Sequence, residues 1–532
     1  MSFLSNNLAA VAVAVVASTA VWLFGGARGD VMIHVSPWLV AFMVEILLCF
    51  PQRHRSETTY EARDRAWSAL RKDPLTWVSL GLMALLLIPF VNNGLCPHCD
   101  AARIAEGISP APPVSFLPFC VSRLGHLDVV QWFALALSSM VAVRHGLTRR
   151  GKRLVLELIV WNGAALAAFG FLQQVLGAPG PLWWTPEGAT DGTFLFFATF
   201  GYPNMAGDYL TSLLGLALAL WRDRLEQLRL ERQMKDVSRT PEKPYGTFWK
   251  KHYFLIPAVV FYFAALNTLS RATIVLSTSI VVLCFVHTLV TVLSRIHRAR
   301  RVVVGVWSLV AFGIVVFFAS LFMPEDIHRE VDTLETTEVL DRVTGKGQYH
   351  SQVATALWKD HKLFGCGGWG YQHLCVPKMK DLNLDLRTLQ TSGGSNVHND
   401  HLQFLAEHGL VGFGAMVAIV LLLLVPIYGG WRKLVKALRF VKRTDPNCPP
   451  RPMQLFVLPA PVFFILAAAL ATVIHAFGDC PMRSSAVLTL FLVELAAMPG
   501  FMPKVREEEP KAELETHHSH RHHHHHHHHG EH

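Results

Sequence analysis

The sequence predicts an all-α integral membrane protein with about twelve transmembrane helices and a large loop before the tenth. Of the 532 residues, 52% are hydrophobic and only 16% are charged, and the mean hydropathy is +0.32. Proteins that fold in water carry about 25% charged residues. The composition therefore excludes the water-soluble class.

Twelve apolar runs approach the length of about 20 residues that a helix needs to cross a bilayer. No Lys or Arg precedes the first run, which favours a retained helix over a secretory signal. In chain order the runs are Leu8–Phe24, Ile33–Phe50, Leu75–Val91, Leu127–Val143, Leu154–Leu176, Met205–Trp221, Tyr253–Leu269, Thr273–Leu293, Val302–Met323, Val411–Tyr428, Gln454–Ile474 and Ser485–Met502.

Lys and Arg concentrate in alternate connections, and such connections favour the cytoplasmic side. Both termini are therefore expected in the cytoplasm. Basic loops that face anionic membrane lipids also explain the net charge of +9 without a nucleic acid partner. The basic connections are Gln52–Asp73, Arg144–Arg153, Arg222–Lys251, Arg295–Arg301 and Arg432–Arg451.

One outer connection, Pro324–Asn399, is far longer than the others and predicts a small extracytoplasmic subdomain. Within it, Gln348–Lys362 has helical spacing, and Gly365–Tyr371 (GCGGWGY) predicts a glycine turn after that helix. The His-rich tract His517–His532 is either an affinity tag or a native metal-binding tail. The predicted segments are an N-terminal bundle (1–193, spans one to five), a central bundle (194–323, spans six to nine), the loop subdomain (324–410), the C-terminal helices (411–504, spans ten to twelve) and a disordered cytoplasmic tail (505–532).

Six of the nine cysteines fall on the predicted outer side, where an even number suggests disulfides. Cys366 and Cys375 bracket the short Gly-Trp-Gly sequence of this turn and are the preferred pair, while Cys120 can pair with Cys96 or Cys99. The CPHC sequence that contains the last two resembles a redox dithiol. No strand precedes it, so a structural disulfide is the favoured interpretation.

Ionisable residues gather in Ser395–Gly412 (SNVHNDHLQFLAEHGLVG), directly before the tenth apolar run. Polar groups at membrane depth are costly, so this segment predicts a functional site. His398 is the candidate general base, because a neutral imidazole within reach of a hydroxyl can take its proton.

Further polar clusters map to the same side. They are the turn Gly201–Gly207 (GYPNMAG), the hairpin Ser270-Arg271, the long loop with Arg342, Lys346, His350 and the glycine turn, and the last outer turn with His475, Asp479 and Arg483, which pairs with the Ser395–Gly412 segment. Arginine stays charged and binds phosphate through two hydrogen bonds. An outer surface that brings Arg271, Arg342 and Arg483 together would suit a diphosphate, and the whole set suits transfer from a lipid diphosphate to an alcohol.

These residues resemble the bacterial O-antigen ligase and polymerase superfamily, whose members are membrane glycosyltransferases with a large periplasmic loop. The resemblance covers about Phe200 to Met502 and agrees in both order and spacing. Its parts are GYPNMAG, the Ser270-Arg271 hairpin, LFGCGGWGY, and HNDHLQFLAEHGLVG, which is similar to the family's His-Asn-x-x-Leu…Glu-x-Gly signature. The first five spans resemble the family only in hydropathy.

The resemblance implies a GT-C-like fold in the bacterial inner membrane, with the active site facing the periplasm. It implies inverting, metal-independent transfer of a glycan from an undecaprenyl-diphosphate carrier to an acceptor hydroxyl, with no cofactor. His398 would be the base, and Arg271 and a loop arginine would hold the diphosphate. Asn399 and Glu407 would orient the His or the loop, and Asn204, His350, His475 and Asp479 would support the same cavity.

The chain departs from the family at the loop arginine, which usually lies closer to the glycine turn, where this sequence has Gln348-Tyr349-His350. Arg342 comes several residues earlier. Either Arg342 still reaches the site, or Lys346, His350 or Arg483 supplies the positive charge.

Several alternatives stay open. Lipid A core is the preferred acceptor, as in an O-antigen ligase, ahead of a growing polysaccharide or a protein. A zinc site formed by His398, His401 and His408 has a weak sequence signal. A secondary transporter or flippase is less favoured, because the two halves of the chain differ and the polar clusters share one side. A purely structural envelope protein is the third option.

Overall fold

The computed structural model describes residues 2–54, 56–92, 114, 116–185, 195–235, 247–294, 296–321, 347–384, 396–444 and 458–503. Within these ranges the chain is helical, and the only β-type pairing is an isolated bridge between Phe197 and Phe200. The all-α prediction is therefore confirmed for the described residues.

Each apolar run overlaps a helix. The helices of the membrane region are α1 (Ser2–Trp22), α2 (Gly29–Cys49), α4 (Pro74–Val91), α6 (Arg123–Val141), α7 (Arg149–Val175), α8 (Pro203–Lys235), α10 (Leu255–Leu266), α11 (Arg271–Leu293), α12 (Arg298–Leu321), α18 (Asp400–Thr444), α19 (Ala460–His475) and α20 (Ser485–Ala497). Two short polar helices, α3 (Thr59–Lys72) and α9 (Thr247–His252), connect them.

Hydroxyl and carboxylate side chains fix where several of these helices begin, because they accept hydrogen bonds from backbone N–H groups of the first turn. Thr58 and Glu61 form a reciprocal capping box at α3. Asp73 caps α4, whose first residue is Pro74. Further caps are Ser122 for α6, Thr148 for α7, Ser270 for α11 and Ser484 for α20.

Six helices in the described part of the chain are long and apolar enough to cross a membrane, namely those that span Gly29–Cys49, Pro74–Val91, Arg123–Gly146, Arg149–Val175, Arg271–Leu293 and Asp400–Ala437. Four shorter helices are also apolar: Asn7–Trp22, Leu255–Leu266, Ala460–His475 and Ser485–Phe501. The chain is thus a membrane protein by length and composition of its helices. The full number of twelve spans and the GT-C-like topology stay predictions.

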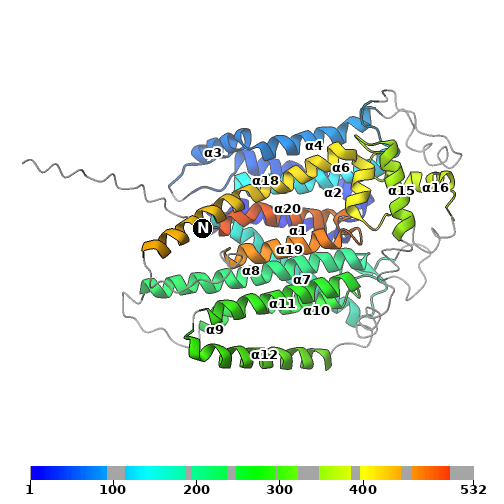
Figure 1. Cartoon of the computed structure of the whole chain (residues 1–532). Helices are drawn as coiled ribbons and strands as arrows, with labels where there is room; N and C mark the ends of the chain where they lie inside the picture. The colour runs from blue at the N-terminus through cyan, green and yellow to red at the C-terminus, as the bar shows by residue number, and fades with distance from the viewer. Residues whose placement is uncertain are drawn as a thin grey trace, which may run out of the picture.

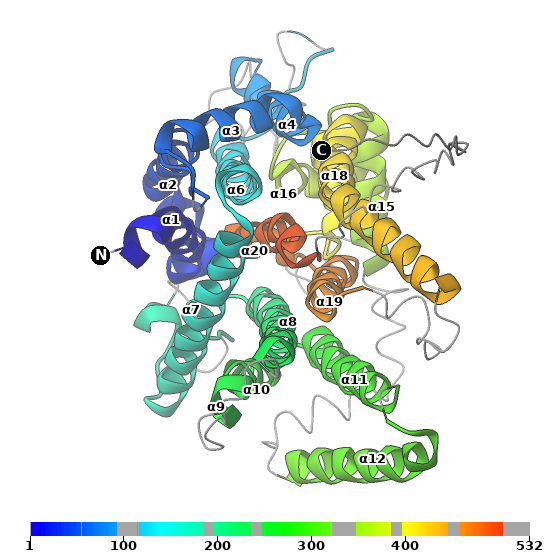
Figure 2. The ribbon, with the colours of Figure 1, turned by 90° about the vertical axis from the view of Figure 1, so that its left-hand side faces the viewer.

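The helices lie side by side in one bundle, with α3 and α9 at one end and the loop helices α15 (Gly347–Asp360) and α16 (Gly370–Asp381) at the other (Figure 1). Viewed along the bundle, α20 lies near its centre and α12 at its edge (Figure 2). Every residue of α20 is buried, whereas Val302 and Trp307 of α12 are 73% and 69% exposed. The end that carries α15 and α16 is called the outer end below.

The helix predicted over Gln348–Lys362 is confirmed by α15, and the glycine turn follows it as predicted. Helix α16, which the sequence analysis did not predict, packs on α15 around a small separate core that includes Val353, Tyr371 and Met379. The range of α18 is interrupted at Gly409, whose φ of 64° and ψ of −170° are not helical, next to the predicted boundary at residue 410. The domain boundaries stay predictions, and the tail 505–532 lies outside the described residues.

Candidate functional site

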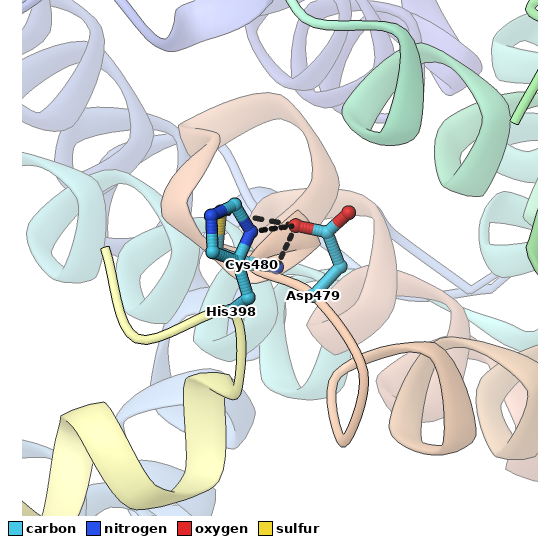
Figure 3. A group of neighbouring side chains, drawn as sticks. All are labelled: His398, Asp479 and Cys480. Carbon is cyan, nitrogen blue, oxygen red and sulfur yellow. Dashed lines mark hydrogen bonds and ion pairs between the residues drawn. The ribbon is translucent and has the colours of Figure 1, made fainter. Parts of the chain in front are cut away.

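His398 and Asp479 face each other at the outer end of the bundle (Figure 3). His398 lies just before α18, and Asp479 lies in the turn between α19 and α20. The imidazole Nδ1 is 3.2 Å from a carboxylate oxygen of Asp479. The His398 side chain is 38% exposed and that of Asp479 only 8%. The pair therefore joins an accessible imidazole to a buried carboxylate.

Further donors converge on the Asp479 carboxylate. The Tyr202 hydroxyl donates at 2.8 Å, the Asn204 amide donates to the second oxygen, and the backbone N–H of Cys480 donates at 2.8 Å. Burial would raise the pKa of Asp479, but the hydrogen bond and positive charge of His398 outweigh it and hold the pKa below its usual range. The carboxylate is therefore an anion that orients the imidazole.

The turn GYPNMAG brings Tyr202 and Asn204 to this carboxylate because α8 starts at Pro203. Gly207 in the same turn lets α11 approach α8 closely, since a Cβ there would lie 2.0 Å from the Thr273 hydroxyl. Arg271 is the first residue of α11, two positions before Thr273, and is half-buried. The first turn of α11 thus lies beside the first turns of α8, and a shared site of Arg271 with His398 stays a prediction.

Backbone hydrogen bonds attach the glycine turn to the first turns of α18. The Gly367 N–H donates to the Glu407 carbonyl at 2.8 Å, and the Leu410 N–H donates to the Lys362 carbonyl at 2.9 Å. Gly409 has φ 64°, and a Cβ on it would lie 2.2 Å from the Leu363 carbonyl, so the approach requires glycine. Asn399 caps α18 by accepting from the Leu402 N–H at 3.0 Å. Asn399 therefore fixes the start of α18, and this hydrogen bond does not orient the His398 ring.

Arg483, predicted as a substrate-binding arginine, is buried. Its guanidinium donates to the Glu407 carboxylate at 2.6 Å, and its Nε is 3.9 Å from Asp400. The group also lies 4.6 Å from the centre of the Trp369 ring, and the residue is only 7% exposed. Arg483 thus lies buried beside Glu407, and its predicted role in binding diphosphate stays a prediction. Glu407 in turn holds Arg483 and the glycine turn.

His350 lies beside the site, with its ring centre 6.2 Å from that of His398. Its Nδ1 is 2.7 Å from the Tyr371 hydroxyl. Burial, followed by the positive charge of His398, lowers the pKa of His350. The lowered pKa favours the neutral ring, which disfavours His350 as the replacement for the family's loop arginine. Arg342 and Lys346 lie outside the described residues, so their role stays a prediction.

His475 forms a separate buried pair with Asp208, with 3.0 Å between Nδ1 and a carboxylate oxygen. It reaches Asp479 only through its backbone carbonyl, which accepts the Asp479 N–H. Asp208 was not predicted as a site residue, and Tyr202 was included only as a member of the GYPNMAG turn. Asp208 had a signal, because it directly follows GYPNMAG at the start of an apolar run, where carboxylates are rare.

The predicted Cys366–Cys375 disulfide is wrong, since both thiols are free. The Cys366 thiol donates to the Ala406 carbonyl, whereas the Cys375 thiol, in α16, donates to the Tyr371 hydroxyl. The turn between them therefore directs the two side chains to different partners. Cys96 and Cys99 lie outside the described residues, so the alternatives for Cys120 stay predictions.

The proposed zinc trio is not assembled either. His401 Nε2 lies 3.1 Å from the Val473 carbonyl. His408 is 4% exposed and packs against His126, with ring centres 6.1 Å apart. The three histidines of the signature thus have three different environments.

An apolar cavity of about 240 Å³ borders this site on the membrane side. Asp400, Glu407 and Arg483 lie at its polar end, and Asp400 connects it to the His398 pair, because its N–H donates to the Asp479 carbonyl at 3.2 Å. The apolar walls come from α6, α18, α19 and α20, and include Phe133, Phe404, Val420, Val473 and Leu488.

Residues 256–417 match the family model described as O-Antigen ligase. The matched range contains Arg271, His398 and Glu407 and ends before Asp479. No curated protein matches the chain. The family match confirms the resemblance to the O-antigen ligase superfamily that was recognised in the motifs, and it supports a membrane glycosyltransferase of the O-antigen ligase or polymerase type.

Proposed function

We propose that the protein transfers a glycan from an undecaprenyl-diphosphate carrier to an acceptor hydroxyl at its outer end, which faces the periplasm. The acceptor that we propose is lipid A core, and the membrane is the bacterial inner membrane. The observation that carries the proposal is the His398–Asp479 pair, within a chain whose residues 256–417 match the O-antigen ligase family.

Asp479 gives His398 the properties of a general base. When Nδ1–H donates to the ionised carboxylate, the lone pair that accepts a proton is on Nε2. As the acceptor oxygen attacks the anomeric carbon, Nε2 takes the hydroxyl proton. The bond from that carbon to the diphosphate oxygen breaks, and the electron pair leaves with the lipid diphosphate. Attack opposite to the leaving group inverts the anomeric configuration.

The leaving diphosphate gains negative charge, which a fixed cation stabilises. Arg271 is the described residue that we assign to this task, because it opens α11 beside the turn that supplies Tyr202 and Asn204. The apolar cavity next to Asp400 supports a substrate that carries a lipid chain. Neither step requires a metal ion, so we propose metal-independent transfer.

The test is a transfer assay with the purified full chain in lipid, an undecaprenyl-diphosphate glycan, and three acceptors in parallel: lipid A core, a polysaccharide repeat unit, and a serine-containing protein. We expect a product with lipid A core that forms equally in EDTA and has inverted anomeric configuration. A product with only one of the other acceptors would reassign the activity within the superfamily. Movement of the carrier across the membrane without any transfer would favour a flippase.

Asp479→Asn is expected to change the pH profile as well as the rate. The carboxylate stabilises protonated His398, and wild-type activity falls as the pH drops and the imidazole becomes protonated. Removal of the negative charge favours the neutral ring, so the acid limb should move to lower pH. The rate at the optimum should also fall, because the amide can hold the wrong tautomer. An unshifted acid limb would contradict the pairing.

Arg271→Ala should lower transfer about a hundredfold, as expected for loss of one charge-stabilising donor. Arg271→Lys should recover part of the rate, because lysine keeps the charge but not the planar geometry of the guanidinium. Arg28→Ala is the matched control, since Arg28 is an outer-end arginine that pairs with Asp30 and stacks on Trp184. Equal losses in the Arg28 and Arg271 variants would count against a specific role for Arg271.

A further inference from the structure

Three donor atoms of different kinds meet at the candidate site. A ring nitrogen of His398, a carboxylate oxygen of Asp479 and Cys480 Sγ all lie within 4.8 Å of one another (Figure 3). The shared carboxylate oxygen is 3.2 Å from the imidazole nitrogen and 3.4 Å from the sulfur. Around one tetrahedral zinc ion, such ligand atoms are about 3.3–3.7 Å apart. We propose that His398, Asp479 and Cys480 bind Zn²⁺ and that the bound ion inhibits transfer.

The backbone already holds these donors close to the required arrangement. Asp479 and Cys480 are adjacent, and the Cys480 N–H donates to the Asp479 carboxylate. His398 has φ 53°, a fixed left-handed conformation, which directs its ring toward them. Metal binding therefore requires little further ordering of these side chains. The half-exposed His398 ring gives an ion access from the outer side.

The mixture of ligand types selects among divalent cations. A thiolate, an imidazole and a carboxylate are all ligands that Zn²⁺ takes up in proteins. Mg²⁺ and Ca²⁺ require oxygen ligands, and only Asp479 supplies one here. With three protein ligands, the fourth position of a tetrahedral zinc ion is left for water.

Inhibition follows from which nitrogen the ion takes, and this step rests on the proposed function. Without metal, the proton is on Nδ1 and the lone pair on Nε2. Zinc forms bonds to Nδ1 and to the Cys480 sulfur, so the thiol releases its proton to water and the neutral imidazole carries its proton on Nε2. The base then has no lone pair for the acceptor hydroxyl.

The experiment measures metal binding and inhibition separately, on the full chain. Co²⁺ replaces Zn²⁺ as a spectroscopic probe, because a thiolate ligand gives an intense ligand-to-metal charge-transfer band that the His-rich tract, which contains no cysteine, cannot produce. We expect this band in the wild type and in Cys366→Ser, a buried thiol outside the cluster. It should be absent from both Cys480→Ser and Cys480→Ala.

In the transfer assay, Zn²⁺ should inhibit the wild type, and Cys480→Ser should raise the half-inhibiting concentration by at least about tenfold. A cobalt band that survives in both Cys480 variants would overturn the site. Equal zinc inhibition of wild type and Cys480→Ser, or a band with no inhibition, would overturn the inhibitory role. If the metal-free wild type transfers no glycan, the proposed function fails while the cobalt result still decides the metal site.

Discussion

His398→Ala is expected to reduce glycan transfer by about 10²–10⁴-fold, the usual contribution of a positioned general base. An alanine side chain cannot take the proton of the acceptor hydroxyl. Loss of the imidazole leaves the Asp479 carboxylate with its other hydrogen-bond donors. The protein should still fold, because the His398 side chain is 38% exposed and contributes little to the core. The measurement is the initial rate of transfer at saturating donor and acceptor.

His401→Ala is the matched control for this prediction. His401 lies one helical turn away in the same segment, but its ring meets the Val473 carbonyl instead of a carboxylate. We expect its rate to stay within a few-fold of the wild type. Full activity in a folded His398→Ala protein would disprove the mechanism, whatever the control shows.

Glu407→Ala is expected to destabilise the protein by about 3–5 kcal/mol, because it leaves a buried guanidinium without its closest counter-charge. Glu407 is 1% exposed and Arg483 is 7% exposed, so water can replace little of the lost interaction. The measurement is thermal unfolding of the full chain in detergent, and the readout is the fraction of protein that stays folded and monodisperse.

The double variant Glu407→Leu with Arg483→Met separates a lost ion pair from damage to packing. Replacing both charges by apolar side chains removes the desolvation cost of the pair, so much of the stability should return. If Glu407→Ala unfolds at the same temperature as the wild type, water enters and solvates Arg483. A double variant as unstable as the single one would mean that side-chain shape matters more than charge at this position.

The sequence predicted the helices well, because their signals are local. Apolar runs of spanning length, capping residues such as Ser270, and glycines such as Gly365 each act within a few residues of their own position. His398, Asn204 and Asp479 were also predicted as site residues, because charged or amide groups next to apolar runs are rare. The structure brings these three together from segments nearly 300 residues apart in the chain.

What the sequence could not predict is the partner of each polar group. Arg483 and Arg271 look alike as arginines in short outer turns, yet Arg483 is buried beside Glu407 and Arg271 is half-buried at the start of α11. His475 and His398 both lie next to spans. His475 pairs with Asp208 inside the bundle, whereas His398 pairs with Asp479 at its surface. Cys366 and Cys375 are close in sequence, but α16 begins between them, so their side chains meet different partners. Such choices depend on how distant helices pack, which hydropathy does not encode.

The position of α20 has a consequence for how the protein is made. This helix contacts α1, α6, α7, α8, α18 and α19 and lies near the middle of the bundle (Figure 2), yet it comes after all of them in the chain. The earlier helices must therefore enter the membrane around a place that α20 fills only after they have been made. Until then the outer turn that carries Asp479 is held on one side only, by α19, so the His398–Asp479 pair is completed late in synthesis.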